Sequence, residues 1–418
     1  MLLILLAACS SQRVLMPAPN LYQGSNAPVL FNDLREESRG NEIDLLFVTD
    51  RTPGRDDQGE LVYGYGRSHS IAFGSAVVKI EPAMPWNELQ SLSLEEERST
   101  KLVLELDSIR EINRFPETPL PVVLHNNTVE IDPEALQQAR NAEKSLRHEL
   151  LKRLEISPRQ EVILFVHGFN NQFGDAAKTL ADLWHFLGRE HVPILYTWPA
   201  GRGGPSGYVY DRESGEFTIF HLKNLLGLLG RMPEIEKIHL IAHSRGTDVL
   251  TSAIRELMLA TKAAGKDPLK EFRIENLVLA APDLDMDVVS QRFIAEYLGA
   301  DVGRVTVYTS QGDKAIGMAE RLFKSTGRIG KLSVDDLSKE NLELTKNISG
   351  ISFVELQESS DRTGHGYFHS SPEASSDLIL TIRYGLEPGA ENGRPMRQLA
   401  PVFWMIEPGY PGNSTNRP

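Results

Sequence analysis

Hydrophobic residues gather in short runs along most of the chain, and segments with helical periodicity separate these runs. Between residues 159 and 386, patterns typical of buried strands occur at 161–166, 193–198, 238–242, 274–281, 305–308 and 351–356. Helical patterns lie between and after them, near 175–187, 217–229, 247–258, 288–298, 315–323 and 375–384. Strict alternation of strands and helices predicts an α/β fold with a mostly parallel central sheet and helices on both faces.

The region 41–158 has a different pattern. Apolar runs at 43–49, 70–80 and 101–106 predict three strands. Asp132-Pro133-Glu134 predicts a helix start, because it combines an acidic N-cap with a proline in the first turn. Apolar residues then continue at helical spacing to about residue 156. We therefore expect the strands and the helix of residues 41–158 to join a core domain at 159–386.

The two ends of the chain lack this periodicity. Residues 1–8 are apolar and precede Cys9, the one cysteine of the chain, and Leu6-Ala7-Ala8-Cys9 resembles a bacterial lipoprotein signal. In this interpretation residues 9–40 form a tether, and Cys9 carries acyl chains that anchor the protein in the cell envelope. Ser10 then favours the outer membrane, facing the periplasm. A frayed N-terminus on a cytoplasmic protein is the alternative, since no Lys or Arg precedes Cys9. Residues 387–418 predict a peripheral tail rich in Pro and Gly.

Composition narrows the class of partner. The chain has 418 residues and a formal net charge of -13 at pH 7. Binding to nucleic acids is driven by Lys and Arg that neutralise phosphates, so this charge argues against a nucleic-acid partner. Outside the N-terminal signal, no stretch approaches the roughly 20 apolar residues that span a bilayer. The sequence thus favours a globular enzyme that is anchored to a membrane but does not cross it.

One motif combines a strand, a sharp turn and a helix. Residues 242–246 read Ala-His-Ser-Arg-Gly, directly after the apolar run 238–242 and before a helical pattern. This is the form of a nucleophile elbow with Ser244 at its apex, in which the neighbours two positions away must be small. Ala242 stands where glycine is usual. The motif predicts that Ser244 is a catalytic nucleophile.

A serine nucleophile needs an imidazole base and a carboxylate that orients the base. In the α/β-hydrolase order the acid follows the serine and the histidine comes last. His365 and His369 lie late enough, and His365, in a loop after the last core strand, is the favoured base. Asp313 is the favoured acid because it follows the penultimate strand, and Asp283 is the alternative acid. Each aspartate could instead be only the N-cap of the next helix.

The oxyanion hole requires two backbone N–H groups directed at the developing negative charge. Arg245, the residue after the nucleophile, is predicted to supply one of them. The second is expected from the loop after an early strand, where residues 166–170 read Val-His-Gly-Phe-Asn. Phe169 is the predicted donor, because Gly168 lets the backbone turn at this point.

Two other patterns predict no further chemistry. The glycine-rich stretch 201–207 lacks the Gly-Lys-Ser/Thr ending of a phosphate-binding loop, so we interpret it as a mobile loop or a flexible connector. His365 and His369 stand four residues apart but lack the sequence context of a zinc hydrolase. The sequence therefore predicts neither a catalytic metal nor a cofactor.

Taken together and in order, the motifs resemble a bacterial family of α/β hydrolases of unknown function. They stand at 166–170, 196–199, 242–246, 280–283, 310–315 and 364–368. Members of this family are described as esterase- or lipase-like, and many are envelope proteins or lipoproteins. The resemblance covers about residues 43–386 and is weakest between 82 and 155, which implies that the region 41–158 carries an insertion there. It implies an α/β-hydrolase fold and a triad of Ser244, Asp313 and His365, but no defined substrate.

These observations predict a membrane-anchored serine hydrolase that cleaves a small-molecule or lipid ester through an acyl-enzyme at Ser244. The alternative is a lipoprotein that uses a hydrolase-like scaffold for binding or envelope assembly, with little turnover. A scaffold of that kind is expected to have lost at least one member of the triad, whereas this sequence keeps all three.

Overall fold

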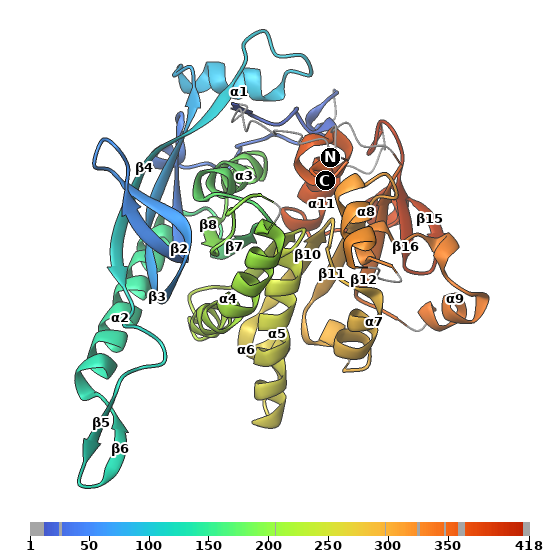
Figure 1. The fold of residues 1–418 in the computed structure, drawn as a ribbon. Coiled ribbons are helices and arrows are strands. Elements are labelled where there is room, and N and C mark those ends of the chain that lie inside the picture. Colours follow the sequence, from blue (N-terminus) through green and yellow to red (C-terminus); the bar gives the residue numbers. More distant parts are fainter. Residues whose placement is uncertain are drawn as a thin grey trace, which may run out of the picture.

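The computed structural model describes residues 12–24, 27–204, 206–296, 298–323, 327–346, 348–357 and 364–412. The predicted signal peptide and Cys9 lie outside these residues. A 12-stranded sheet runs through the described part of the molecule, in the order β1-β4-β3-β2-β8-β7-β9-β10-β11-β12-β16-β15 (Figure 1). From β2 to β16 all neighbouring strands are parallel, and the strands at the two margins are antiparallel. The predicted α/β-hydrolase fold with a mostly parallel sheet is confirmed.

The strands of this sheet come from an N-terminal part of the chain and from the core that follows it. Those in the N-terminal part are β1 (Arg13–Val14), β2 (Glu42–Arg55), β3 (Leu61–Glu81) and β4 (Val103–Arg114). Those of the core are β7 (Glu161–Val166), β8 (Val192–Thr197), β9 (Lys237–His243), β10 (Ile274–Ala280), β11 (Arg304–Thr309), β12 (Ile351–Leu356), β15 (Arg397–Ala400) and β16 (Phe403–Ile406). Two small separate sheets are formed by β5 (Val122–His125) with β6 (Thr128–Ile131), and by β13 (Glu387–Pro388) with β14 (Gly393–Arg394).

Helices cover both faces of the sheet. The longer ones are α1 (Trp86–Leu94), α2 (Pro133–Ile156), α3 (Phe173–Phe186), α4 (Gly207–Gly230), α5 (Gly246–Ala263), α8 (Lys314–Phe323) and α11 (Pro372–Ile382). The shorter ones are α6 (Pro268–Phe272), α7 (Met286–Val289), α9 (Lys339–Thr345) and α10 (Tyr367–Ser370). The helix expected near 288–298 is replaced by α7 and a π-helical turn at Ser290–Ile294. Among the described residues, none of the helices combines the length and apolar character needed to cross a bilayer.

Strand periodicity divides the interior into two hydrophobic layers. Successive side chains of a strand point to opposite faces of the sheet. In β7, Ile163 and Phe165 pack with α3 and α11, whereas Val162, Leu164 and Val166 pack with α2, α4 and α5. Because both faces are covered, every residue of β7 is buried, which explains why the strand reads as a continuous apolar run.

Both predicted ends differ from expectation. The described part of the expected tether packs against the body: Leu15, Met16 and Leu21 are buried in the core, and β1 pairs with β4. The expected tail contributes β16, which pairs with β12 and extends the central sheet. The apolar runs of these segments, at 14–16 and 402–406, are short and lie among Pro, Gly and Asn, so no longer periodic pattern indicated their packing.

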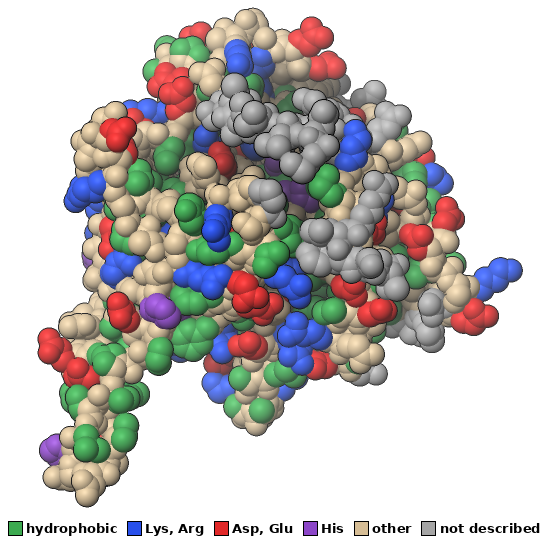
Figure 2. Space-filling model, viewed as in Figure 1, with side chains coloured by type: hydrophobic (Ala, Val, Ile, Leu, Met, Phe, Trp, Pro, Cys, Tyr) green, Lys and Arg blue, Asp and Glu red, His purple; other side chains and the backbone are tan. Residues whose placement is uncertain are grey.

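The hairpin of β5 and β6 projects from the body at the lower left of Figure 1. Its cross-strand pairs Val122–Ile131 and Leu124–Val129 share one face, and all four side chains are exposed. Figure 2 shows hydrophobic side chains along this projection. The hairpin lies within the predicted insertion and leads directly into α2, whose predicted start is confirmed: the Asp132 side chain accepts a hydrogen bond from the backbone N–H of Glu134.

Candidate active site

Ser244 lies in the turn between β9 and α5, at the carboxyl end of the parallel strands. Its φ is +52°, a left-handed conformation that residues other than glycine rarely adopt. The turn is also crowded. A Cβ added to Gly246 would lie 2.3 Å from the carbonyl oxygen of His167, and one added to Gly168 would lie 2.8 Å from the Cβ of Ser244. Glycine at these two positions therefore lets the serine-bearing turn contact the loop after β7.

The predicted base and acid meet in the structure. Nδ1 of His365 lies 2.7 Å from Oδ2 of Asp313, and the carboxylate is fully buried. The other oxygen, Oδ1, accepts a hydrogen bond from the backbone N–H of Ile316, so Asp313 also caps the start of α8. The imidazole is 18% exposed. Because Asp313 engages Nδ1, a proton accepted from a serine would be held at Nε2.

His243 connects the base to the elbow, although sequence reasoning assigned it no role. Its Nε2 lies 3.1 Å from the carbonyl oxygen of His365, and the two rings are 4.7 Å apart. On another side, its ring lies 4.7 Å from that of Phe368. Since His243 immediately precedes Ser244, these contacts bring the loop of the base to the turn of the nucleophile.

The loops after β10, β11 and β12 are tied together beneath this site. The hydroxyl of Tyr367 donates a hydrogen bond to the carbonyl oxygen of Tyr308 and accepts one from the N–H of Ala281. Gly364, with φ +68°, has no room for a Cβ, which would lie 2.8 Å from the carbonyl oxygen of Gly312. The histidine loop can therefore approach the aspartate loop closely.

The alternative residues have other contacts. The Asp283 carboxylate forms an ion pair with Arg328 at 2.8 Å and accepts a hydrogen bond from the Tyr208 hydroxyl at 2.5 Å. Both of its oxygens are thus engaged away from His365. The alternative base, His369, lies in α10, whereas the imidazole in contact with Asp313 is that of His365.

The two predicted oxyanion donors share one property. In the described part of the chain, neither the backbone N–H of Phe169 nor that of Arg245 has a hydrogen-bond partner. Buried N–H groups without a hydrogen-bond partner are uncommon in folded proteins. Two such donors directed at the same point stabilise the negative charge that develops in a transition state. The Arg245 side chain does not enter this arrangement, because it forms an ion pair with Asp248 at 2.6 Å.

Arg51, from β2, holds the loop that carries Phe169. Its buried guanidinium donates to the carbonyl oxygens of Asn171 at 2.8 Å and Ala200 at 2.7 Å, and it lies 3.2 Å from Nε2 of His167. Burial lowers the pKa of Arg51 to about 10, so the group remains charged at neutral pH. Nothing in the sequence pattern around Arg51 predicted this role, because most of its partners, including Asn171 and Ala200, lie more than a hundred positions along the chain.

His167 is buried and neutral. Its Nε2 accepts a hydrogen bond from the backbone N–H of Trp198, so Nδ1 carries the proton and donates to the carbonyl oxygen of Gly168. Burial, and then the charge of Arg51, keep the pKa of His167 well below its usual value. The imidazole therefore shapes the loop and is not available as a second base.

Asp211, on α4, holds the same loop from the other side. Its Oδ2 accepts hydrogen bonds from the backbone N–H groups of Asn170 at 2.9 Å and Gly201 at 3.1 Å. Burial raises the pKa of Asp211 above its usual value, although these backbone hydrogen bonds act in the opposite direction. The described part of the glycine-rich stretch 201–207 is thus joined to the loop after β7, and α4 begins at its end.

A family comparison adds to this geometry. The model of the family described as "Alpha/beta hydrolase of unknown function (DUF900)" matches residues 142–383, more than half of the chain. The chain belongs to this family. Comparison with curated proteins returns no match. The matched region of this α/β hydrolase includes Ser244, Asp313, His365 and the loop after β7, whereas Arg51 lies outside it.

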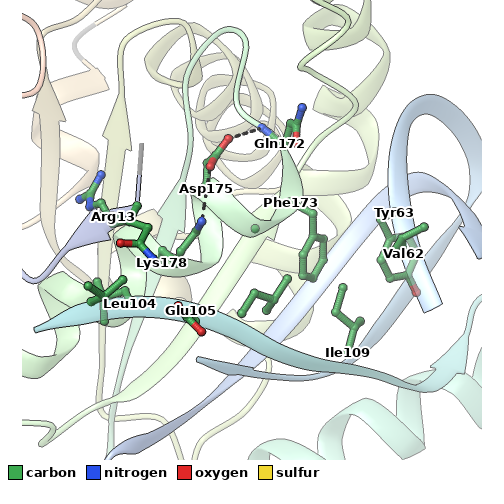
Figure 3. Close-up of a pocket in the computed structure, with 14 residues that line it drawn as sticks. Arg13, Val62, Tyr63, Leu104, Glu105, Ile109, Gln172, Phe173, Asp175 and Lys178 are labelled. Atoms are coloured by element: carbon green, nitrogen blue, oxygen red, sulfur yellow. Dashed lines mark hydrogen bonds and ion pairs between the residues drawn. The ribbon is translucent and has the colours of Figure 1, made fainter. Parts of the chain in front are cut away.

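A cavity of about 440 Å³ lies beside the amino end of α3 (Figure 3). Its lining combines aliphatic and aromatic side chains, including Tyr63, Leu106 and Phe173, with the charged Arg13 and Lys178. Ser244, Asp313 and His365 are not among the lining residues. This α/β hydrolase therefore has a partly apolar cavity next to the helix that follows its candidate oxyanion loop.

Proposed function

We propose that this protein is a serine hydrolase that cleaves esters through an acyl-enzyme at Ser244. The observation that carries the proposal is the hydrogen bond between His365 and the buried Asp313, on a loop that His243 connects to the serine-bearing turn. Membership of an α/β-hydrolase family supports a hydrolase scaffold, and these contacts supply the parts that ester cleavage needs.

In the proposed reaction, Oγ of Ser244 attacks the ester carbonyl carbon while Nε2 of His365 takes the hydroxyl proton. Collapse of the tetrahedral intermediate breaks the bond to the leaving alcohol, which receives that proton. Water then repeats the sequence: His365 takes its proton, hydroxide adds to the acyl carbon, and the proton returns to Ser244 as the acid leaves. Asp313 keeps the imidazole oriented throughout and stabilises its charged form.

The oxyanion of each intermediate is stabilised by the N–H groups of Phe169 and Arg245. Such donors are most effective when they are held in place before the reaction, because no reorganisation is then needed. Arg51 and Asp211 provide this preorganisation for the loop after β7 through their buried hydrogen bonds. The proposal thus gives these two charged residues a positioning role.

A fluorophosphonate probe tests the nucleophile directly, because it reacts covalently with an activated serine. We expect the purified protein to be labelled, Ser244→Ala to abolish labelling, and the exposed Ser99→Ala to be labelled like the wild type. Absence of labelling in the folded wild type, or labelling that persists in Ser244→Ala, would contradict the proposal.

Activity on p-nitrophenyl esters of increasing acyl length then tests ester cleavage. It also shows which acyl length is cleaved fastest. We expect turnover that Ser244→Ala removes. If the probe labels Ser244 but no ester is turned over, the scaffold has an activated serine but acts mainly in binding or assembly, which is the alternative function.

We also propose that the hydrolase is lipid-anchored at Cys9, in the outer membrane and facing the periplasm. The support is the sequence 6–9, Leu-Ala-Ala-Cys, followed by serine. Metabolic labelling with a palmitate analogue should mark the wild-type chain and not Cys9→Ser. Label that persists in Cys9→Ser would overturn the anchor while leaving the catalytic proposal intact.

A further inference from the structure

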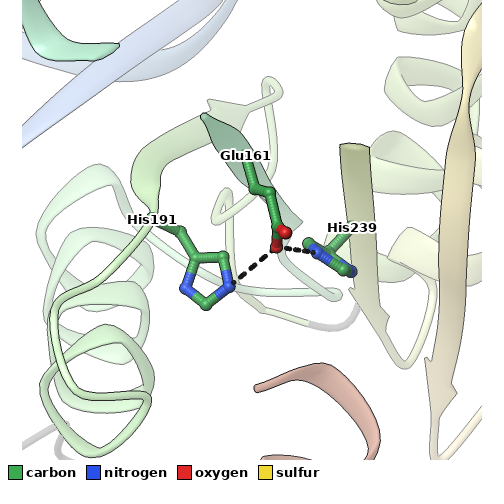
Figure 4. Close-up of side chains that lie close together, drawn as sticks. All are labelled: Glu161, His191 and His239. Atoms are coloured by element: carbon green, nitrogen blue, oxygen red, sulfur yellow. Dashed lines mark hydrogen bonds and ion pairs between the residues drawn. The ribbon is translucent and has the colours of Figure 1, made fainter. Parts of the chain in front are cut away.

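Three side chains converge at the end of the sheet opposite to Ser244. Glu161 is the first residue of β7, His191 directly precedes β8, and His239 lies near the start of β9 (Figure 4). Oε2 of Glu161 lies 2.9 Å from Nε2 of His239 and 3.3 Å from Nε2 of His191. All three residues are buried, and one ligand atom from each lies within 4.8 Å of the others. They therefore place one carboxylate and two imidazoles around a common point.

His191 has no other use for its polar atoms. The residue is 1% exposed, and neither ring nitrogen has a hydrogen-bond partner within the described residues. The proximity of its Nε2 to Glu161 is thus an electrostatic contact without hydrogen-bond geometry. Burying an imidazole in this way is unfavourable unless a partner satisfies it. Nε2 faces the carboxylate of Glu161 at 3.3 Å, so a closer partner for this nitrogen would lie at the point of convergence.

The second ring nitrogen of His239 also has a fixed partner. Its Nδ1 lies 2.9 Å from Nδ2 of Asn276, whose Oδ1 accepts a hydrogen bond from Arg304 at 2.8 Å. Ligand imidazoles usually donate a hydrogen bond from the nitrogen that does not touch the metal, whereas here Asn276 donates to that nitrogen. Asn276 and Arg304 thus fix the ring of His239 with Nε2 toward Glu161.

We propose that Glu161, His191 and His239 bind a divalent transition-metal ion, with Zn²⁺ as the best match. Two neutral imidazoles and one carboxylate are common zinc ligands, and at bond lengths of 2.0–2.1 Å tetrahedral ligand atoms lie about 3.4 Å apart. The separations of 2.9 Å and 3.3 Å in the structure are both shorter than that value, so the side chains would move apart slightly as the ion binds. The Glu161 side chain is 11% exposed, so solvent can supply a water molecule as fourth ligand.

Binding requires one proton to move. With Asn276 donating to Nδ1, the ring of His239 carries its proton on Nε2, the nitrogen that the metal needs. When the ion binds, this proton is replaced at Nε2 and Nδ1 becomes protonated, so the Asn276 amide rotates to present its oxygen to Nδ1. Arg304 loses one acceptor but keeps its hydrogen bond to Glu387 at 2.8 Å.

The ion would take no part in ester cleavage. β8, β7 and β9 are neighbours in the sheet, so the three ligands would join adjacent strands. His239 precedes Ser244 by five residues of a strand, which places the site about 16 Å from the nucleophile. The site is therefore independent of the proposed activity, and probe labelling of Ser244 distinguishes failure of one proposal from failure of the other.

The first experiment measures metal in the untagged full-length protein by inductively coupled plasma mass spectrometry, before and after chelation. We expect about one Zn²⁺ per chain before chelation. We also expect added Zn²⁺ to raise the melting temperature of the chelated protein by about 5 °C. Less than a tenth of an equivalent together with no shift on adding Zn²⁺ would overturn the proposal.

Variants then locate the ion. His191→Gln and His239→Gln should each weaken Zn²⁺ binding by at least about tenfold, whereas the exposed surface histidine variant His148→Gln should bind like the wild type. Equal weakening by His148→Gln would place the ion elsewhere and contradict the site.

Asn276→Asp provides a test that does not remove a ligand. An aspartate can accept from Arg304 and from Nδ1 of His239 together, so the amide rotation is no longer needed and the ligand becomes more basic. We expect Zn²⁺ to bind about tenfold more tightly. Unchanged affinity in a folded Asn276→Asp protein would contradict ligation by His239 even if His191→Gln or His239→Gln failed to fold.

Discussion

The part of the chain that the family model covers and the part before it contribute differently to the candidate site. Residues 142–383 contain the serine, the acid, the base and both predicted oxyanion donors. Residues 12–141 add the antiparallel margin of the sheet, α1 and the projecting hairpin, and Arg51 from this part forms a hydrogen bond to the loop after β7. The chemistry thus lies in the family core, while the N-terminal region supports the geometry of one loop.

The largest expected effect is in the core. Asp313→Asn removes the charge that orients His365 and stabilises its protonated form, so we expect kcat/KM on the best p-nitrophenyl ester to fall by about 10³- to 10⁴-fold. Asp283→Asn, which changes the other candidate acid, should lower it by less than about tenfold. A larger loss of kcat/KM in Asp283→Asn than in Asp313→Asn would identify Asp283 as the acid. The contact between Asp313 and His365 would then not be required for catalysis.

A smaller effect is expected from the N-terminal region. Arg51→Lys keeps the charge but cannot reproduce the fork of hydrogen bonds to Asn171 and Ala200. Because the loop would be less well positioned, we expect kcat to fall roughly tenfold with little change in KM. Arg55→Lys, an exposed change near the end of β2, should leave both constants unchanged. Equal activity of Arg51→Lys and the wild type would show that the core holds the loop without help.

The contact between the two regions should respond to pH. His185 of α3 is buried, its Nδ1 accepts hydrogen bonds from Arg189, and its Nε2 lies 2.8 Å from Oγ of Ser93 in α1. Burial, followed by nearby arginine charges, keeps the pKa of His185 well below its usual value of 6.5. The unfolded chain therefore takes up a proton below pH 6.5 that the folded protein does not, and stability is lost as the pH falls beneath this value.

Urea unfolding at pH 7.5 and 5.5 measures this effect. One such histidine changes the free energy of unfolding by at most about 1.4 kcal/mol per pH unit. His185→Gln should be less stable at pH 7.5 but should show a shallower loss on acidification than the wild type. An unchanged pH dependence would mean that His185 is not among the groups that couple stability to pH.

The smallest effect is expected at the projecting hairpin. Leu124→Ser changes an exposed residue of the apolar face, so kcat/KM and the melting temperature should stay within experimental error of the wild type. Fluorescence of a hydrophobic dye should fall, and it should fall less in Val123→Ser, on the opposite face. A large loss of activity in Leu124→Ser would show that the N-terminal region matters to catalysis beyond Arg51.

The sequence predicts the structure correctly where a local pattern of residues determines it. The core strands are buried on both faces, so their continuous apolar runs and the alternating helices were sufficient to predict the fold. The serine turn was recognisable because strain and crowding at Ser244 require small neighbours at fixed spacing. The predicted base and acid, His365 and Asp313, followed from strand order and are in contact in the structure.

The remaining features depend on contacts between residues far apart in sequence. Arg51 binds backbone oxygens more than a hundred residues away, and no local pattern encodes such a partner. His243 occupies a variable position of the serine motif, so its packing against His365 had no signature. Glu161, His191 and His239 lie at or near the starts of three separate strands and converge because β8, β7 and β9 are neighbours.

The packing of Asn20 has a consequence for the order of folding. Its side-chain amide donates to the carbonyl oxygen of Tyr410, a contact across 390 positions, and the N–H of Leu21 donates to Ser376. The segment around Asn20 cannot make these contacts until the chain as far as Tyr410 is available for folding. This segment would thus be among the last to dock, and a chain truncated before β12 should remain sensitive to proteases around residue 20.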